Sequence, residues 1–479
     1  MYNALENSMD TISEDRQCYS GWKFRILAFG LCSIVCSWIA MVAKSTGEET
    51  DARETPFQTC SEPDSDRKLT DFTRIQMEAI VKRFKLKDPT DIELLPAYLE
   101  KWAEWEEAIL ETNISILDLS PIPFLSDYRS PCWISRLSSH PPEYVWSRGR
   151  ENDIVMRYWQ ESHDDGVRFR LRCLPYFYIV GVVKSGTTDL FHRICSHPDV
   201  AEVLRKEYHW WSYLRPPDGE LVREKHGGDS GLPVPMSVYV NAFDVPAEDI
   251  RNSSALHLII GDGSPSTATH ITTESSSPMG PELINADFIY HVTPQARIIY
   301  IVRDPVERLY SAYLFFHQYE YKSPELFHKR VKARVDAFTK CTSTYGSIRP
   351  CVYHRFGQQD GVEDNIARMS VTDGMYSVLI EDWVKVFSHE AILVLRMEDM
   401  PPTMEDTMKR VLIHLGIRRF DKVSLRGSMT EDIDKMRRVR HRKVPDMWNS
   451  TRKMLQDFYR PFNKHLSDLT HNSKYNWGY

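Results

Sequence analysis

Residues 176–190 read YFYIVGVVKSGTTDL, and this stretch decides the fold. The aromatic and β-branched run at 176–183 predicts a buried strand. A turn at 184–188 follows, and the apolar residues of 189–195 then have helical spacing. A strand, a glycine-containing turn and a helix N-terminus form an anion cradle, because backbone N–H groups and the positive end of the helix dipole point at one place. We therefore expect this turn to bind a phosphate group.

The residue types in the turn agree with this expectation. Gly186 lets the backbone approach the anion closely, Lys184 supplies a positive charge, and Thr187 and Thr188 supply hydroxyl donors. The turn is not a Walker A loop, because Lys184 precedes the second glycine and Thr187 stands where the Walker lysine would be. An ATP-dependent kinase is therefore disfavoured.

A second stretch, RIIYIVRDPVERLYSAYLFF at 297–316, has the same design. Residues 298–302 predict another buried strand, and the proline after Arg303-Asp304 suits the first turn of a helix. Arg303 then lies at the carboxyl end of a strand, where ligands of open α/β sheets gather, and Ser311 lies on the following helix. We expect Arg308 to be a solvated or ion-paired helix residue.

The two stretches together resemble the donor-binding motifs of sulfotransferases, which use 3′-phosphoadenosine 5′-phosphosulfate (PAPS). K-S-G-T-T resembles the 5′-phosphosulfate loop, although Val183 replaces the usual proline, and R-D-P-x-x-R-x-Y-S resembles the 3′-phosphate motif. The resemblance implies that Arg303 and Ser311 hold the 3′-phosphate and that Lys184 stabilises the leaving oxygen. It implies no metal, and it assigns the phosphosulfate to the turn residues Lys184, Ser185, Gly186, Thr187 and Thr188.

The segment RKEYHWW at 205–211 carries the candidate proton-transfer groups. It resembles the K-E-x-H-[FW]-[FW] segment of glycosaminoglycan sulfotransferases, which implies that Glu207 is the general base and Lys206 an assisting cation. His209 is the alternative base, since its ordinary pKa lies near neutrality. Trp210 and Trp211 are candidates for the floor of a sugar site, and core packing explains them equally well.

A further loop, GDGSPST at 261–267, resembles the acceptor side of the same sites. The resemblance implies that Asp262 and Ser264 contact the acceptor or orient Lys206, while turn chemistry explains the same residues. In the basic run at 437–443, Arg442 and Lys443 match a loop that wraps the PAPS phosphates. Such a run also suits a sulfated polysaccharide or a solvated surface.

Composition and further strands complete the fold prediction. The 479 residues hold 60 basic and 67 acidic side chains, which argues against a nucleic-acid partner. With strands also expected at 257–261 and 391–396, we predict an α/β fold with a P-loop-like parallel sheet between helices. The sulfotransferase domain is expected at 130–479. Residues 44–129 would be a stem with a helical extension, for which a homodimer stalk is an alternative.

The N-terminal region predicts a membrane anchor. Residues 26–43 are uncharged and just long enough to span a bilayer, with Lys23 and Arg25 before them. We expect a short cytosolic tail (1–25), a single-pass type II topology and a Golgi location; a cleaved signal peptide is the alternative. Sequons at Asn113, Asn252 and Asn449 agree with a lumenal body.

Six cysteines follow the predicted span, an even number that allows disulfides. Cys341 and Cys351 are the favoured pair because they close a short loop. Cys132 and Cys173 are a second candidate pair.

The acceptor is suggested by resemblance alone. The segments RCLPYFYIVG, GTTDLFHRICSHPDV, KEYHWW and GDGSPST are similar to carbohydrate sulfotransferases that add a 6-O-sulfate to N-acetylgalactosamine 4-sulfate in chondroitin and dermatan sulfate. Heparan sulfate sulfotransferases share the donor motifs and are the main alternative. A non-catalytic Golgi glycan-binding protein is the third.

Overall fold

In the computed structural model, all described residues belong to the second of two units into which the chain divides, Lys68–Tyr479. The described residues are 74–111, 114–137, 150–164, 168–215, 234–270, 277–316, 322–354, 356, 370–400, 404–418 and 446–479. The predicted span at 26–43 lies outside them, as do Asn113, Arg442 and Lys443. Among the described helices, none combines the length and apolar character needed to cross a membrane.

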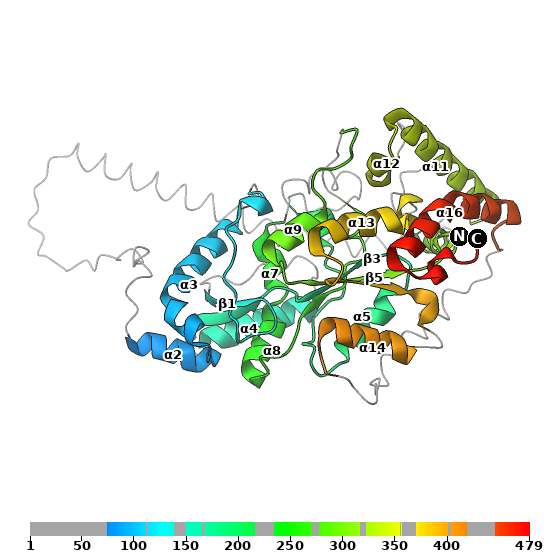
Figure 1. Cartoon of the computed structure of the whole chain (residues 1–479). Coiled ribbons are helices and arrows are strands. Elements are labelled where there is room, and N and C mark those ends of the chain that lie inside the picture. Colours follow the sequence, from blue (N-terminus) through cyan, green and yellow to red (C-terminus); the bar gives the residue numbers. More distant parts are fainter. Residues whose placement is uncertain are drawn as a thin grey trace, which may run out of the picture. The chain divides into compact units, whose positions relative to one another are not determined.

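Figure 1 shows the elements of this second unit around its central sheet. The strands are β1 (Cys132–Arg136), β2 (Phe169–Cys173), β3 (Phe177–Gly181), β4 (Gly261–Asp262), β5 (Arg297–Val302) and β6 (Ile392–Arg396). The helices are α2 (Arg74–Phe84), α3 (Pro89–Ala108), α4 (Arg150–Asp164), α5 (Thr187–Cys195), α7 (Met236–Asn241), α8 (Asp244–Ser253), α9 (Asn285–Val292), α10 (Pro305–Phe316), α11 (Pro324–Tyr345), α12 (Arg349–Tyr353), α13 (Tyr376–Phe387), α14 (Met404–Leu415) and α16 (Asn449–Thr470). Short helical turns lie at Ile116–Asp118, Trp210–Leu214, Thr372–Gly374, Met397–Asp399 and Ser473–Asn476.

The main sheet has the order β4-β3-β5-β6, and all its neighbours are parallel. Three of the four expected strands are confirmed within a few residues. The strand expected at 257–261 is wrong in extent, because only Gly261 and Asp262 pair with β3. Ile259 upstream forms a bridge with Val200 instead. The chain therefore reaches β3 only briefly before it turns into the polar loop at 263–267.

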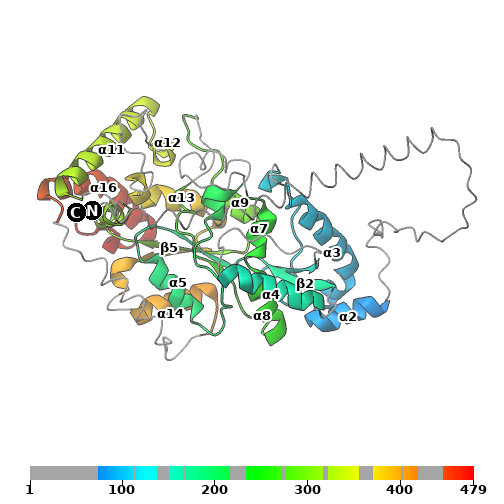
Figure 2. The same cartoon turned by 180° about the vertical axis from the view of Figure 1, so that it is seen from behind.

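Helices cover both faces of this sheet, as expected, because alternate residues of its strands point to opposite sides. Ile299 and Ile301 of β5 pack in a core with α5 and α14, whereas Ile298 and Tyr300 pack on the side of α9, α13 and α16. The view from behind in Figure 2 shows α5 and α14 on one side of β5 and α13 on the other. All of β5 except Arg297 is buried.

The helical extension, α2 and α3, belongs to the same unit as the parallel sheet. Strands β1 and β2, which the sequence did not lead us to expect, form an antiparallel pair on which α3 packs. Trp105 of α3 meets Trp133 of β1 edge-on with ring centroids 5.4 Å apart. Glu106 of α3 accepts from the buried Arg172 of β2 at 2.5 Å. An aromatic contact and a satisfied ion pair thus fix α3 to the β1–β2 pair.

Both candidate cysteine pairs are joined in the structure. Cys132 and Cys173 lie opposite each other in the antiparallel β1–β2 pair and form a disulfide. Cys341 near the end of α11 is bonded to Cys351 of α12. The second bridge closes a loop of ten residues' separation, as the sequence favoured.

Candidate active site

The donor loop lies between β3 and α5, and its backbone takes the shape that an anion cradle requires. Gly186 caps α5 with a φ of 90°, a conformation that favours glycine. Lys184 also has a positive φ, of 71°. The first N–H groups of α5 have no partner within the helix. The Ser185 hydroxyl is buried and has no hydrogen-bond partner among the described residues. These donors suit a bound anion at this point.

The two donor motifs meet because β3 and β5 are parallel neighbours whose carboxyl ends lie at one edge. An Arg303 guanidinium nitrogen lies 3.5 Å from the carbonyl oxygen of Lys184. The Lys184 ammonium lies over the ring of Phe315 in α10, 3.8 Å from its centroid. Ser311 is half-buried on α10, one turn before Phe315. The structure therefore brings Lys184 and Arg303 together, on the same side as α10.

Arg308 was expected to be either solvated or ion-paired, and the structure shows that it is ion-paired and buried. Its side chain is fully buried, 3.6 Å from the Asp373 carboxylate. A second guanidinium nitrogen donates to the Ser370 carbonyl oxygen at 2.6 Å. Arg308 therefore ties α10 to the turn at 370–374 instead of facing a ligand.

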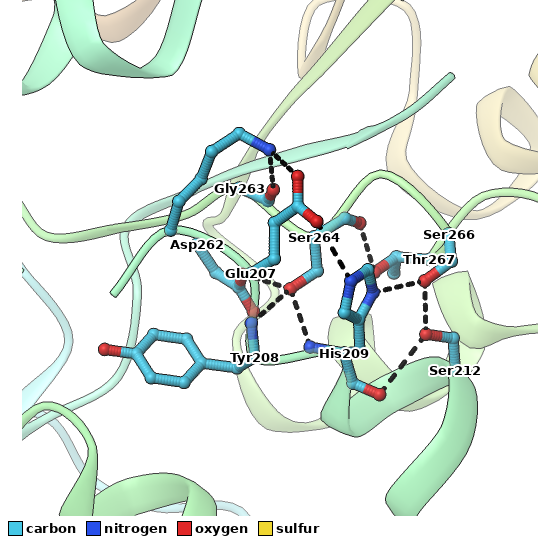
Figure 3. A network of polar contacts seen from close by, with 10 residues as sticks. Glu207, Tyr208, His209, Ser212, Asp262, Gly263, Ser264, Ser266 and Thr267 are labelled. Carbon is cyan, nitrogen blue, oxygen red and sulfur yellow. Dashed lines mark hydrogen bonds and ion pairs between the residues drawn. The ribbon is translucent and has the colours of Figure 1, made fainter. Parts of the chain in front are cut away.

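The proton-transfer candidates form one cluster on the segment after α5, shown in Figure 3. One oxygen of the Glu207 carboxylate pairs with the Lys206 ammonium, and the other lies 3.2 Å from Nε2 of His209. Lys206 also donates to the Gly263 carbonyl oxygen at 3.1 Å. The Glu207 side chain is 38% exposed, against 10% for Lys206. Glu207 is thus the member of the pair that a substrate can reach.

The electrostatics of the cluster keep Glu207 ionised. Burial alone would raise the pKa of Glu207, but the hydrogen bond from His209 and the charge of Lys206 outweigh it and lower the pKa to about 2. For Lys206 burial is the stronger influence and lowers its pKa, while Glu207 acts in the opposite direction. The carboxylate is therefore able to accept a proton at neutral pH.

Both ring nitrogens of His209 are engaged. Nε2 faces Glu207, and Nδ1 lies 2.7 Å from the hydroxyl oxygen of Ser266. The backbone of His209 has a φ of 54°, in the left-handed region. A base needs a free nitrogen for the acceptor, so this arrangement presents His209 as a partner of Glu207 rather than as the base.

The assignment of Asp262 and Ser264 to acceptor contact is wrong, because both side chains are buried and fully used inside the protein. The Ser264 hydroxyl accepts the backbone N–H groups of Tyr208 and His209 at 3.0 and 2.9 Å, and donates to Asp262 at 2.6 Å. Asp262 in turn accepts from the Tyr239 hydroxyl at 2.8 Å. Burial raises the pKa of Asp262. These residues hold the segment 206–209 in place, and Lys206 is oriented by Gly263.

The assignment of Trp210 and Trp211 to a sugar-binding floor is also wrong. Both side chains are fully buried. The ring of Trp210 stacks on Tyr239 of α7 at 5.1 Å, and its indole N–H donates to the Val234 carbonyl oxygen at 2.9 Å. The helical turn Trp210–Leu214 directs both indoles into the core, which is the alternative that the sequence left open.

Sequence reasoning missed two residues of this cluster, Ser212 and Ser266. Their hydroxyl oxygens lie 2.6 Å apart in the core, directly behind the His209 ring. Serines within GDGSPST and HWWSY carry no pattern that predicts this meeting, because it depends on how two distant loops pack. The sequon residues Asn252 and Asn449 are both exposed.

Comparisons with known proteins agree with this geometry. A family model described as a sulfotransferase domain matches residues 174–461. Carbohydrate sulfotransferase 15 of Homo sapiens is 33% identical over 398 residues, which cover 78% of this chain and 69% of the human protein. The Rattus norvegicus protein of that name is also 33% identical, over 76% of this chain and 68% of its own. A bifunctional heparan sulfate N-deacetylase/N-sulfotransferase 2 of Bos taurus is 22% identical over 75% of this chain and 35% of its own. With the donor loop and Arg303 at one sheet edge, the chain belongs to the carbohydrate sulfotransferases, which take their sulfuryl group from PAPS.

Proposed function

We propose that this enzyme transfers a sulfuryl group from PAPS to the 6-hydroxyl of N-acetylgalactosamine 4-sulfate in chondroitin or dermatan sulfate, with Glu207 as the general base. The observation that carries the mechanism is the half-exposed Glu207 carboxylate between Lys206 and His209. The donor side rests on the cradle at 184–188 and on Arg303 beside it.

The described residues fit the donor. The buried Ser185 hydroxyl and the N–H groups at the start of α5 suit the 5′-phosphosulfate. Arg303 and Ser311 suit the 3′-phosphate, since a guanidinium fork engages phosphate oxygens well. When bound, PAPS supplies an activated sulfuryl group. Arg442 and Lys443 stay predicted phosphate contacts on the strength of resemblance.

In the proposed step, Glu207 takes the proton of the acceptor hydroxyl while that oxygen forms its bond to sulfur. The bond from sulfur to the bridging phosphate oxygen breaks, and the electron pair stays on that oxygen. Lys184 stabilises the charge that develops there. The products are the sulfated sugar, a protonated Glu207 and 3′-phosphoadenosine 5′-phosphate (PAP).

The low pKa of Glu207 fits this role only if the acceptor changes its surroundings. A carboxylate with a pKa of about 2 is a weak base. An acceptor hydroxyl that displaces Lys206 from its oxygen of the carboxylate removes one interaction that stabilises the charged form, while His209 keeps its contact with the other oxygen. The pKa of Glu207 then rises as the acceptor binds, which couples basicity to correct binding.

The acceptor class is supported by resemblance to chondroitin and dermatan sulfate enzymes in the four quoted segments. Identity to the human carbohydrate sulfotransferase is 33%, whereas identity to the bovine protein with heparan sulfate in its name is 22%. A heparan sulfate acceptor is therefore the second candidate. A glycan-binding protein without activity is the third and is disfavoured by the complete Lys184, Arg303 and Glu207 set.

The test is transfer of radiolabelled sulfate from PAPS to chondroitin, chondroitin 4-sulfate, dermatan sulfate and heparan sulfate, followed by disaccharide analysis. We expect label in disulfated galactosamine units. Label in heparan sulfate would replace the proposed acceptor. PAP binding without label in any polymer would contradict the proposed transfer to these four acceptors.

We also propose that the enzyme is a single-pass type II protein of the Golgi membrane with its catalytic region in the lumen. The uncharged stretch 26–43 with Lys23 and Arg25 before it supports this proposal. Two disulfides and the exposed sequon residues Asn252 and Asn449 suit a lumenal environment. Glycosidase digestion of the full chain from membranes tests it, and a glycan-free, protease-accessible catalytic region would contradict it.

A further inference from the structure

Behind the Glu207–His209 pair, two serine hydroxyls continue the line of hydrogen bonds into the core (Figure 3). His209 Nδ1 lies 2.7 Å from the Ser266 hydroxyl oxygen, which lies 2.6 Å from that of Ser212. The Ser212 hydroxyl also lies 3.3 Å from the His209 carbonyl oxygen. Ser212 and Ser266 are almost completely buried, and the segments that carry them are 54 positions apart. The chain of contacts is thus Glu207, His209, Ser266, Ser212.

The direction of each hydrogen bond follows from the carboxylate. An ionised carboxylate only accepts, so Nε2 of His209 must carry the hydrogen that it shares with Glu207. When His209 is neutral, its Nδ1 then accepts from Ser266, and Ser266 accepts from Ser212. When His209 is charged, Nδ1 donates to Ser266, Ser266 donates to Ser212, and Ser212 donates to the His209 carbonyl oxygen.

Rotation of two hydroxyl groups therefore satisfies both protonation states of His209 without movement of the ring. An apolar residue in place of Ser266 would remove the partner of Nδ1 in both the neutral and the charged state of His209. The ring would then lose the hydrogen bond that fixes its orientation, and rotation of the ring takes the Nε2 donor away from Glu207.

We infer that Ser266, supported by Ser212, is a positioning residue that acts on Glu207 through His209. The two hydroxyls keep the Nε2 hydrogen of His209 directed at the carboxylate at any pH at which the enzyme works. The inference rests on the proposed role of Glu207 as the base. Neither serine reaches the surface, so neither contacts the acceptor.

The other charged groups around the pair do not replace this contact. Lys206 binds the opposite oxygen of Glu207. Asp262 is engaged by Ser264 and Tyr239. His192 and Cys195 of α5 interact electrostatically with Lys206 rather than with Glu207. Loss of the His209 contact therefore raises the pKa of Glu207, since the hydrogen bond from His209 lowers it.

The test is a double-mutant cycle in the intact enzyme between Ser266→Ala and His209→Ala, with kcat measured across pH at saturating PAPS. We expect Ser266→Ala alone to lower kcat about five- to tenfold, which is the weight of one buried hydrogen bond, and to move the acid limb of the pH profile to higher pH. In the His209→Ala background Ser266→Ala should have no further effect. PAP affinity should be unchanged in all four proteins.

Thr267→Val is the matched control, because Thr267 is equally buried in the same loop but its hydroxyl donates to the Ser264 carbonyl oxygen at 2.8 Å. It should leave the pH profile in place. Equal losses from Ser266→Ala with and without His209 would overturn the inference, as would a wild-type kcat and pH profile in Ser266→Ala. The separate variant Glu207→Gln distinguishes failure of the proposed base from failure of the positioning role. Full activity of Glu207→Gln would refute Glu207 as the base. An inactive Glu207→Gln together with an unaffected Ser266→Ala would refute only the positioning role of Ser266.

Discussion

The donor loop at 184–188 and the acceptor-side segment at 205–212, which packs on the loop at 261–267, differ in their hydrogen bonds. The donor loop has donors left for a ligand, whereas the acceptor-side segment is already bonded within the protein. At the donor loop, the buried Ser185 hydroxyl has no partner among the described residues, and the first N–H groups of α5 point out of the helix. At the acceptor side, Glu207, His209 and Ser264 are each engaged by neighbours in the protein. The donor end therefore has donors available for a ligand, whereas the acceptor end is internally bonded.

This difference follows from the chemistry at each end. The donor presents the same phosphate group in every turnover, so fixed backbone N–H groups can bind it without rearrangement of the loop. A proton must leave the acceptor at the other end, so a base must be charged, oriented and reachable before the acceptor arrives. Variants at the two ends should consequently affect different quantities, and the following experiments test that division.

Apart from Glu207→Gln, the largest loss of activity is expected at Lys184, which belongs to the donor loop but acts on the reaction. Lys184→Met removes the charge beside the leaving oxygen and should lower kcat about 10²- to 10³-fold. Steady-state kinetics with saturating PAPS measure this. Lys453→Met, at an exposed position of α16, is the control. A kcat within twofold of wild type would mean that another group stabilises the leaving oxygen.

Arg303 should affect donor binding more than turnover. Arg303→Gln removes a charged contact to the 3′-phosphate, so PAP should bind about 10- to 100-fold more weakly. Calorimetric titration with PAP gives the Kd directly. Arg460→Gln replaces a half-exposed arginine on α16 and should leave the Kd unchanged. Unchanged PAP affinity in Arg303→Gln would break the assignment of the 3′-phosphate site.

Trp210 distinguishes a structural from a substrate-binding role at the acceptor end. Trp210→Phe loses packing on Tyr239 and an indole hydrogen bond, and should lower the free energy of unfolding by about 1–3 kcal/mol. Chemical denaturation measures this loss, and KM for the polysaccharide should not change. Trp448→Phe, at a 45% exposed position, should have little effect on stability. A raised KM with unchanged stability in Trp210→Phe would restore the sugar-floor interpretation.

The smallest effect is expected at Asp199, in the connection between α5 and the acceptor-side segment. Hydrogen bonds from Arg418 lower the pKa of the Asp199 carboxyl to about 2, although its burial acts in the opposite direction. A carboxyl with a depressed pKa stabilises the fold above its unfolded pKa near 4, and this stabilisation is lost as pH falls towards 2. Asp199→Asn should therefore lower Tm slightly at pH 7.

The difference in Tm between the wild-type protein and Asp199→Asn should become smaller as the pH falls below 4. Thermal melts of both proteins at pH 7, 5 and 3 test the expectation. Asp457→Asn, whose exposed carboxylate pairs with Lys453 and Arg460 on α16, serves as the comparison. A constant difference in Tm down to pH 3 would show that the Asp199–Arg418 pair does not contribute through its charge.

The donor end could be predicted well from the sequence because each of its parts is local. Buried strands with continuous apolar residues, such as Ile298–Val302 in RIIYIVRDP, can be predicted from the sequence without knowledge of tertiary contacts. A parallel sheet then places the ends of neighbouring strands together. The meeting of Lys184 and Arg303 followed from these two facts.

The acceptor end was predicted only in its motif residues, because its geometry depends on contacts between distant loops. Asp262, Ser264 and Ser266 look like turn residues in sequence, and only packing against 206–212 reveals what they hold. The paired tryptophans could not be assigned because an aromatic ring suits a core and a sugar equally. The antiparallel pair β1–β2 was not predicted because its strands are only five residues long and β2 carries two arginines, Arg170 and Arg172, which pair with carboxylates inside the protein.

The most direct test of the account is Glu207→Gln, with kcat for sulfate transfer to chondroitin 4-sulfate and the Kd for PAP measured on the same preparation. Glutamine keeps the shape but cannot take the proton, so we predict a loss of about 10²- to 10⁴-fold in kcat with unchanged PAP affinity. Glu202→Gln, at the exposed glutamate five residues earlier, should behave like wild type in both measurements. A Glu207→Gln enzyme that retains its kcat, or that loses PAP binding in proportion to activity, would contradict the separation of the two ends and the role of Glu207 as the base.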